Sequence, residues 1–97
     1  MQRNYRVAAG PRRRAGEIDL ILRDTDGTLV FVEVRVRAGG SHGGAAASVS
    51  AAKRASLVLA ARHYLQRYGS TLPSCRFDVV AIDAGRLDWL RAAFDGD

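Results

Sequence analysis

The sequence of 97 residues contains little cysteine, lysine or proline, and it has no long apolar run. Its single cysteine, Cys75, excludes an intramolecular disulfide, and one thiol without several Cys or His companions excludes a structural zinc site. No stretch approaches the roughly 18 apolar residues of a membrane-spanning helix, and Met1 is not followed by the apolar core of a signal peptide. We therefore expect a protein of the reducing cytoplasm with no membrane partner.

Acidic residues are fewer than basic ones, because 15 lysine and arginine residues stand against 10 aspartate and glutamate residues, for a formal net charge of +5. All but one of these cations are arginines, since Lys53 is the only lysine. A composition of 47% hydrophobic and 26% charged residues excludes wholesale disorder and low-complexity architectures. We expect one domain over residues 1–97, whose positive charge favours polyanionic partners without identifying one.

Strand-like and helix-like patterns follow one another along the chain without an internal repeat. Apolar residues at helical spacing predict a long helix that starts at Ser48 or Ser50 and ends at Tyr68, before a possible C-cap at Gly69. The other expected elements are strands over 2–7, 16–24, 28–37 and 76–83, loops over 8–15 and 38–47, and a short amphipathic helix over 87–94. This order predicts a small α/β or α+β domain, built on a mixed sheet with a long flanking helix.

The segments 16–24 and 28–37 form a predicted hairpin, and its register decides which side chains share a face. A two-residue loop at Asp26-Gly27 would mix acids with aliphatic residues on both faces. A three-residue loop over 25–27, with Gly27 in the left-handed conformation, instead pairs Leu20 with Val32. One face then carries only aliphatic side chains: Ile18, Leu20, Leu22, Val30, Val32 and Val34. We predict this second register.

The opposite face of the predicted hairpin gathers charged side chains. Three cross-strand pairs share it: Asp19 with Glu33, Glu17 with Arg35, and Ile21 with Phe31. Carboxylates about 5 Å apart repel each other, so a fold that juxtaposes them neutralises them with a cation, a shared proton or a metal ion. Their oxygens suit a hard ion such as Mg²⁺, and Arg35 would direct a positive charge at a phosphate. A solvated ion-pair ladder on an exposed sheet face is the alternative that the residues leave open.

The sequence resembles the YraN family, an uncharacterised family of predicted endonucleases. The resemblance covers nearly the whole chain and rests on five ordered segments: GEIDLI at 16–21, VFVEVR at 30–35, GGAAASVSAAK at 43–53, ARHYL at 61–65 and RFDVVAI at 76–82. That family is similar in fold to archaeal Holliday-junction resolvases and to the PD-(D/E)XK nuclease superfamily. The resemblance therefore implies a restriction-endonuclease-like fold and a Mg²⁺- or Mn²⁺-dependent endonuclease that acts on structured or branched DNA.

The resemblance also implies roles for individual residues. By position, Asp19 resembles the metal-binding aspartate of the superfamily and Glu33 the acid of its E-x-K element, so both would hold the metal ion. Arg35 takes the place of the motif lysine as a catalytic cation, and Glu17 is a candidate additional acid. A guanidinium is effectively always charged, so Arg35 stabilises a phosphate but exchanges protons poorly.

A second departure from the family concerns the start of the chain. Family members usually begin with a helix that carries a further glutamate, whereas this sequence starts inside what resembles their first strand. We expect either that the true start lies upstream of Met1 or that this is a trimmed version without the first family helix.

Basic residues outside the hairpin are candidate nucleic-acid contacts. These are Arg12, Arg13 and Arg14 in the first loop, and Lys53 and Arg54 at the start of the long helix. A solubilising cation run and a solvated helix face are the corresponding alternatives. Resolvases of this fold dimerise, which makes a homodimer a candidate assembly. We predict a metal-dependent nuclease; the rival prediction is a non-catalytic nucleic-acid-binding module that retains the nuclease fold.

Overall fold

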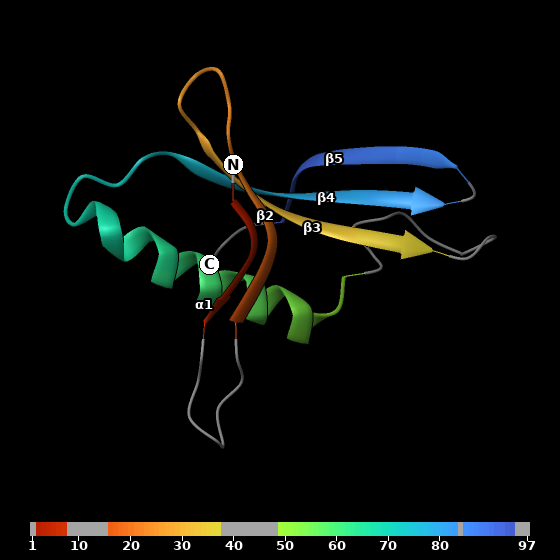
Figure 1. Cartoon of the computed structure of the whole chain (residues 1–97), viewed down its shortest axis with the longest axis horizontal. Coiled ribbons are helices and arrows are strands. Elements are labelled where there is room, and N and C mark those ends of the chain that lie inside the picture. Colours follow the sequence, from red (N-terminus) through yellow and green to blue (C-terminus); the bar gives the residue numbers. More distant parts are fainter. Residues whose placement is uncertain (1, 8–15, 38–48, 84, 95–97) are drawn as a thin grey trace.

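The computed structural model describes residues 2–7, 16–37, 49–83 and 85–94. These residues build one five-stranded sheet, with the strands in sequence order, and one long helix (Figure 1). The elements are β1 (Gln2–Val7), β2 (Gly16–Arg23), β3 (Leu29–Arg37), α1 (Ala51–Leu65), the short 3-10 helix η2 (Gln66–Tyr68), β4 (Cys75–Asp83) and β5 (Arg86–Phe94). The predicted α+β class with a mixed sheet and a long flanking helix is confirmed.

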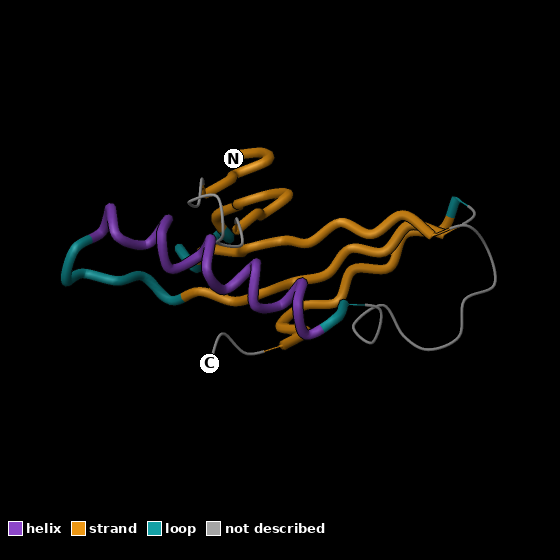
Figure 2. The backbone as a smooth tube through the Cα atoms, turned by 90° about the horizontal axis from the view of Figure 1, so that it is seen from below, coloured by secondary structure: helices purple, strands orange, loops and turns teal. Residues whose placement is uncertain are grey.

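The sheet is mixed because β3 and β4 run parallel, while every other neighbouring pair is antiparallel. Parallel neighbours need a crossover connection, and α1 supplies it on one face of the sheet. In Figure 2 the helix lies along that face, while β1 and β2 turn away from the direction shared by the other three strands. This arrangement is consistent with the restriction-endonuclease-like fold that the family resemblance implies.

The hairpin register is confirmed between Leu20 and the loop, whereas the predicted pair of Asp19 with Glu33 lies beyond the last regular pair. Leu20 pairs with Val32, and the pairing continues to Arg23 with Leu29. Gly27 adopts φ 91°, the left-handed conformation that the predicted three-residue loop requires. The loop closes through a 2.8 Å hydrogen bond that the Asp24 amide donates to the Thr28 carbonyl oxygen.

The alternation of faces along β2, by contrast, breaks at Asp19. Ile18 was expected beside Leu20 on the aliphatic face, but it is fully buried with Ile21 in the core beneath α1, so that expectation is wrong. The reason lies in β1, where Asn4 has a φ of 51° and forms no regular cross-strand pair with Asp19. The register of β1 with β2 is the same on both sides of Asn4, so no residue is inserted as in a β-bulge, and the side chains change face at the left-handed residue. This irregularity leaves Asp19 at the point where β2 changes face.

Helix α1 begins and ends as the sequence predicts. The Ser50 side chain caps it by accepting a 3.1 Å hydrogen bond from the Lys53 amide, and the helical path continues through η2 to Gly69, whose φ is 60°. The other expected cap, Ser48, lies outside the described residues. The helix packs closely on β2, because a Cβ atom added to Gly16 would lie 2.8 Å from the Ala60 nitrogen. Glycine at this position therefore sets the distance between helix and sheet.

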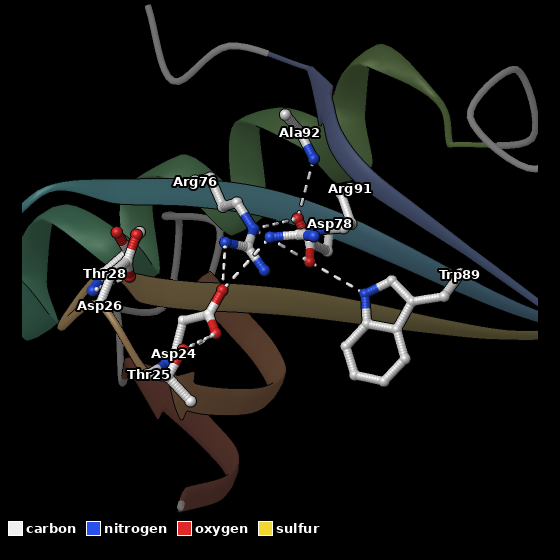
Figure 3. A network of polar contacts seen from close by, with 9 residues as sticks. All are labelled: Asp24, Thr25, Asp26, Thr28, Arg76, Asp78, Trp89, Arg91 and Ala92. Atoms are coloured by element: carbon white, nitrogen blue, oxygen red, sulfur yellow. Dashed lines mark hydrogen bonds and ion pairs between the residues drawn. The ribbon is translucent and has the colours of Figure 1, made fainter.

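The segment 87–94 was expected to be a short helix, and this prediction is wrong, because it forms strand β5 at the edge of the sheet. Asp78, which is fully buried on β4, holds β5 through two of its three hydrogen-bond partners, and the third, Arg76, lies on β4 itself (Figure 3). Its carboxylate accepts hydrogen bonds from the Trp89 indole at 2.9 Å, the Ala92 amide at 2.9 Å and the Arg76 guanidinium at 3.1 Å. A buried carboxylate needs such partners, so the tertiary contact overrides the local helical pattern.

Asp78 should therefore be a principal determinant of stability. Asp78→Asn replaces one accepting oxygen by an amide that faces donors, and we expect it to lower the free energy of unfolding by about 3 kcal/mol in urea denaturation. Asp88→Asn is the matched control, because Asp88 is exposed and its ion pair with Arg86 spans 3.7 Å. That variant should change stability by less than about 0.5 kcal/mol. Equal effects of the two substitutions would contradict this role of Asp78.

Candidate active site

Asp19 lies where the pairing between β2 and β3 stops. The regular ladder ends at Leu20 and Val32, and beyond it the Asp19 Oδ2 atom accepts a 2.8 Å hydrogen bond from the Val34 amide. A side chain thus takes the place of a cross-strand carbonyl oxygen. This bond fixes the carboxylate between the two strands.

Glu33 is buried between β3 and α1, with only 3% of its side chain exposed. Its Oε2 atom lies 3.5 Å from Lys53 Nζ and 3.9 Å from an Arg35 guanidinium nitrogen. Its Oε1 atom is buried and has no hydrogen-bond partner. The pKa of Glu33 is raised to about 7. Burial of the carboxyl group is the largest cause, and a hydrogen bond and charge repulsion from Asp19 add to it, while the positive charge of Lys53 opposes the shift. The structure therefore brings the two predicted metal-binding acids together.

The two basic residues at the start of α1 have different surroundings. Lys53 faces Glu33, whereas the Arg54 guanidinium lies 5.5 Å from the centre of the Phe94 ring, on another side of the helix. Sequence reasoning placed both residues among candidate nucleic-acid contacts and missed the contact of Lys53 with Glu33. The sequence could have indicated this contact, because Lys53 is the only lysine and lies in the first turn of a helix that was expected to cover the acidic face of the hairpin.

Glu17 lies farther along β2. Its cross-strand partner is Arg6 of β1, with 3.7 Å between Arg6 Nε and Glu17 Oε1, and the predicted pairing with Arg35 is wrong. The physical reason is the divergence of β2 from β3 beyond Leu20. The candidate nucleic-acid contacts Arg12, Arg13 and Arg14 lie outside the described residues.

The donor set around Asp19 and Glu33 fits a hard divalent cation. Two carboxylates share the site, one of them has an unpartnered buried oxygen, and burial together with the neighbouring Asp19 raises the pKa of Glu33 despite the nearby Lys53. Within the described ranges, no group of three or more acidic, histidine or cysteine side chains gathers. Mg²⁺ commonly binds proteins through one or two carboxylates and completes its shell with water and phosphate oxygens, so these acids are sufficient as side-chain ligands.

Comparison with known proteins identifies the family. Residues 1–82 match the model of the uncharacterised protein family UPF0102. The chain belongs to this family. It is the family that the sequence motifs indicated under the name YraN, so the resemblance is confirmed.

Individual UPF0102 relatives are similar over almost the entire sequence. The UPF0102 protein Mpe_A3766 of Methylibium petroleiphilum is 68% identical over 98% of this chain and 77% of its own length. UPF0102 proteins of Paracidovorax citrulli and a Polaromonas species are 60% and 56% identical over 98% of this chain and 67% of theirs. In the described part of the chain, no helix has the length and apolar character needed to cross a bilayer.

The raised pKa of Glu33 predicts a pH-dependent effect of Glu33→Gln. The folded state binds the Glu33 proton more tightly than the unfolded state, so ionisation destabilises the fold as the pH rises from about 4.5 to about 7. In EDTA at pH 8, Glu33→Gln should increase the free energy of unfolding by up to about 3 kcal/mol. The gain should vanish near pH 4.

Urea denaturation across this pH range measures the effect of Glu33→Gln. The exposed-acid variant Asp88→Asn is the control and should show no comparable dependence on pH. A Glu33→Gln protein that is less stable than the parent at pH 8 would show that ionised Glu33 is well compensated in the fold.

Proposed function

We propose that this protein is a metal-dependent endonuclease that hydrolyses phosphodiester bonds in structured or branched DNA. The observation that carries the proposal is the buried Glu33 carboxylate, with an unpartnered oxygen, next to Asp19. Burying the Glu33 carboxylate beside a second, half-buried acid is costly unless a cation compensates the pair. A solvated ion-pair ladder on an exposed sheet face would have left Glu33 exposed, as the acid of the pair Arg86–Asp88 is.

Asp19 and Glu33 are the residues that hold Mg²⁺ or Mn²⁺ in this proposal. A divalent ion held by these two carboxylates would supply an activated water and charge stabilisation at the phosphate. The Val34 amide fixes the orientation of Asp19, and α1 excludes water from Glu33. Preorganised ligands of this kind need no rearrangement when the substrate binds.

Arg35 and Lys53 supply positive charge next to the acids. Each lies within 4 Å of Glu33 Oε2, and each remains partly exposed, at 39% and 30% of its side chain. Arg35 is suited to hold a phosphate oxygen, because its guanidinium is planar and always charged. Lys53 and Arg54 extend the basic surface along α1, and with Arg12, Arg13 and Arg14 they are the proposed contacts to the DNA backbone.

A second candidate function is a nucleic-acid-binding module that retains the nuclease fold without catalysis. The replacement of the motif lysine by Arg35 favours it, because arginine keeps the charge but not the proton exchange. For both functions we infer a cytoplasmic protein, from its lone cysteine, and we retain a homodimer as the candidate assembly.

Cleavage of labelled junction, flap and single-stranded DNA with added Mg²⁺ or Mn²⁺ tests the proposal. Asp19→Asn and Glu33→Gln should each reduce cleavage by at least about 100-fold, while the control Asp88→Asn should retain it. Unchanged cleavage by the two site variants would show that the assignment is wrong. Salt-dependent binding without any cleavage by the parent protein would support the binding module instead.

Lys53 and Arg54 offer a matched test of which cation serves the site. They are adjacent in sequence and equal in charge, but only Lys53 approaches Glu33. Lys53→Met should reduce cleavage by about 10- to 100-fold, whereas Arg54→Met should mainly weaken DNA binding. Rates at saturating DNA separate the two effects. Equal losses in both variants would indicate that Lys53 acts only through general backbone attraction.

A further inference from the structure

A shallow cavity of about 310 Å³, largely open to solvent, lies beside Asp19. It is lined by Arg3, Asn4, Asp19, Leu20 and Val34. Leu20 and Val34 belong to the aliphatic cluster separate from the core beneath α1, so the cavity lies away from Lys53 and from the helix. Its volume is at the lower end of that of small-ligand pockets.

The backbone of β1 creates the polar wall of this cavity. Arg3 pairs with Leu20 and Tyr5 pairs with Ile18, yet Tyr5 packs on the core beneath α1 while Arg3 lines the cavity. In a regular strand these two side chains would share a face. Asn4, with its φ of 51°, separates them. A left-handed residue costs roughly 1 kcal/mol even though asparagine tolerates it well, and strain of this kind is concentrated at functional sites.

Arg3 and Asp19 line the same cavity but form no ion pair with each other. Within the described part of the chain, the Arg3 guanidinium has no hydrogen bond or ion pair, although Asp19 lines the same cavity. The Asn4 side chain likewise has no hydrogen-bond partner among the described residues. An unpaired guanidinium with a neighbouring amide suits a phosphate, which accepts two parallel hydrogen bonds from arginine. Leu20 and Val34 offer an apolar wall to the adjoining sugar or base.

We infer that this cavity is a phosphodiester-binding subsite, in which Arg3 and Asn4 hold a nucleic-acid phosphate next to Asp19. The inference rests on the proposed function, since it states that a phosphodiester group of the DNA substrate binds in the cavity next to Asp19. It assigns to β1 a direct contact with the substrate. It also explains the left-handed conformation of Asn4, which strand pairing in the sheet does not require.

Binding of the dinucleotide thymidylyl-thymidine to the whole protein in EDTA tests the subsite without metal or cleavage. Amide chemical shifts of residues 3, 4, 20 and 34 should change in a saturable manner. Arg3→Ala should weaken this binding by about tenfold. Arg86→Ala is the matched control, because Arg86 is an exposed arginine at the far edge of the sheet, and it should leave the binding unchanged.

Asp19 provides a second measurement with an unusual sign. In EDTA its carboxylate repels a phosphate held beside it, so Asp19→Asn should tighten dinucleotide binding about fivefold, although the same substitution should reduce metal-dependent cleavage. Asn4→Gly retains access to the left-handed conformation and removes only the amide, so it should weaken binding by a few-fold without loss of the fold.

Three results would overturn the subsite: no shift changes at these residues at millimolar dinucleotide, equal weakening by Arg3→Ala and Arg86→Ala, or weaker binding after Asp19→Asn in EDTA. Failure of the nuclease proposal is a separate result, seen as absent metal-dependent cleavage while the dinucleotide still binds at the cavity. Inorganic phosphate in place of the dinucleotide shows whether the phosphate group suffices or the sugar and base contribute.

Discussion

The hydrogen bond from the Val34 amide to the Asp19 carboxylate is the interaction on which the site depends. It occurs one residue past the last regular pair of β2 and β3, where a strand amide would otherwise lack a partner. By satisfying that amide, Asp19 allows β2 to leave β3 without the cost of an unpaired donor. The divergence of the strands and the position of the acid are therefore one feature. Beyond it, Glu17 pairs with Arg6 of β1.

Helix α1 contributes the second half of the site by burying Glu33. The close approach of Ala60 to Gly16 seats the helix directly on β2, and the helix start then brings Lys53 over β3. Burial in this environment raises the pKa of Glu33 to about 7, which means that the ionised carboxylate destabilises the folded state. Residues that lower the free energy of unfolding in this way are common at functional sites, where binding of a charged ligand offsets the loss of stability.

The parts of the fold that depend on local patterns could be predicted from the sequence. The hairpin register follows from Gly27 and the aliphatic alternation, and the start of α1 follows from the Ser50 cap. The position of Ile18 could not be predicted, because the shift originates in the backbone of Asn4 on another strand. The strand β5 could not be predicted either, because it depends on hydrogen bonds to the buried Asp78 carboxylate of β4. The local sequence of residues 87–94 instead favours a helix.

The same distinction between local sequence patterns and tertiary packing determines which parts of the candidate site could be predicted. Asp19 and Glu33 could be found from the register because they lie near its last regular pair, whereas the contact of Lys53 with Glu33 depends on how α1 packs. The two acids also face different surroundings: Glu33 faces the helix and its lysine, and Asp19 borders the cavity lined by Arg3. A buried acid beneath a helix is poorly placed to meet a polymer directly. In the proposed reaction the nucleic acid therefore contacts Arg3 and Asn4 at the cavity beside Asp19 as well as the basic side chains of α1, and Glu33 would share the metal ion with Asp19.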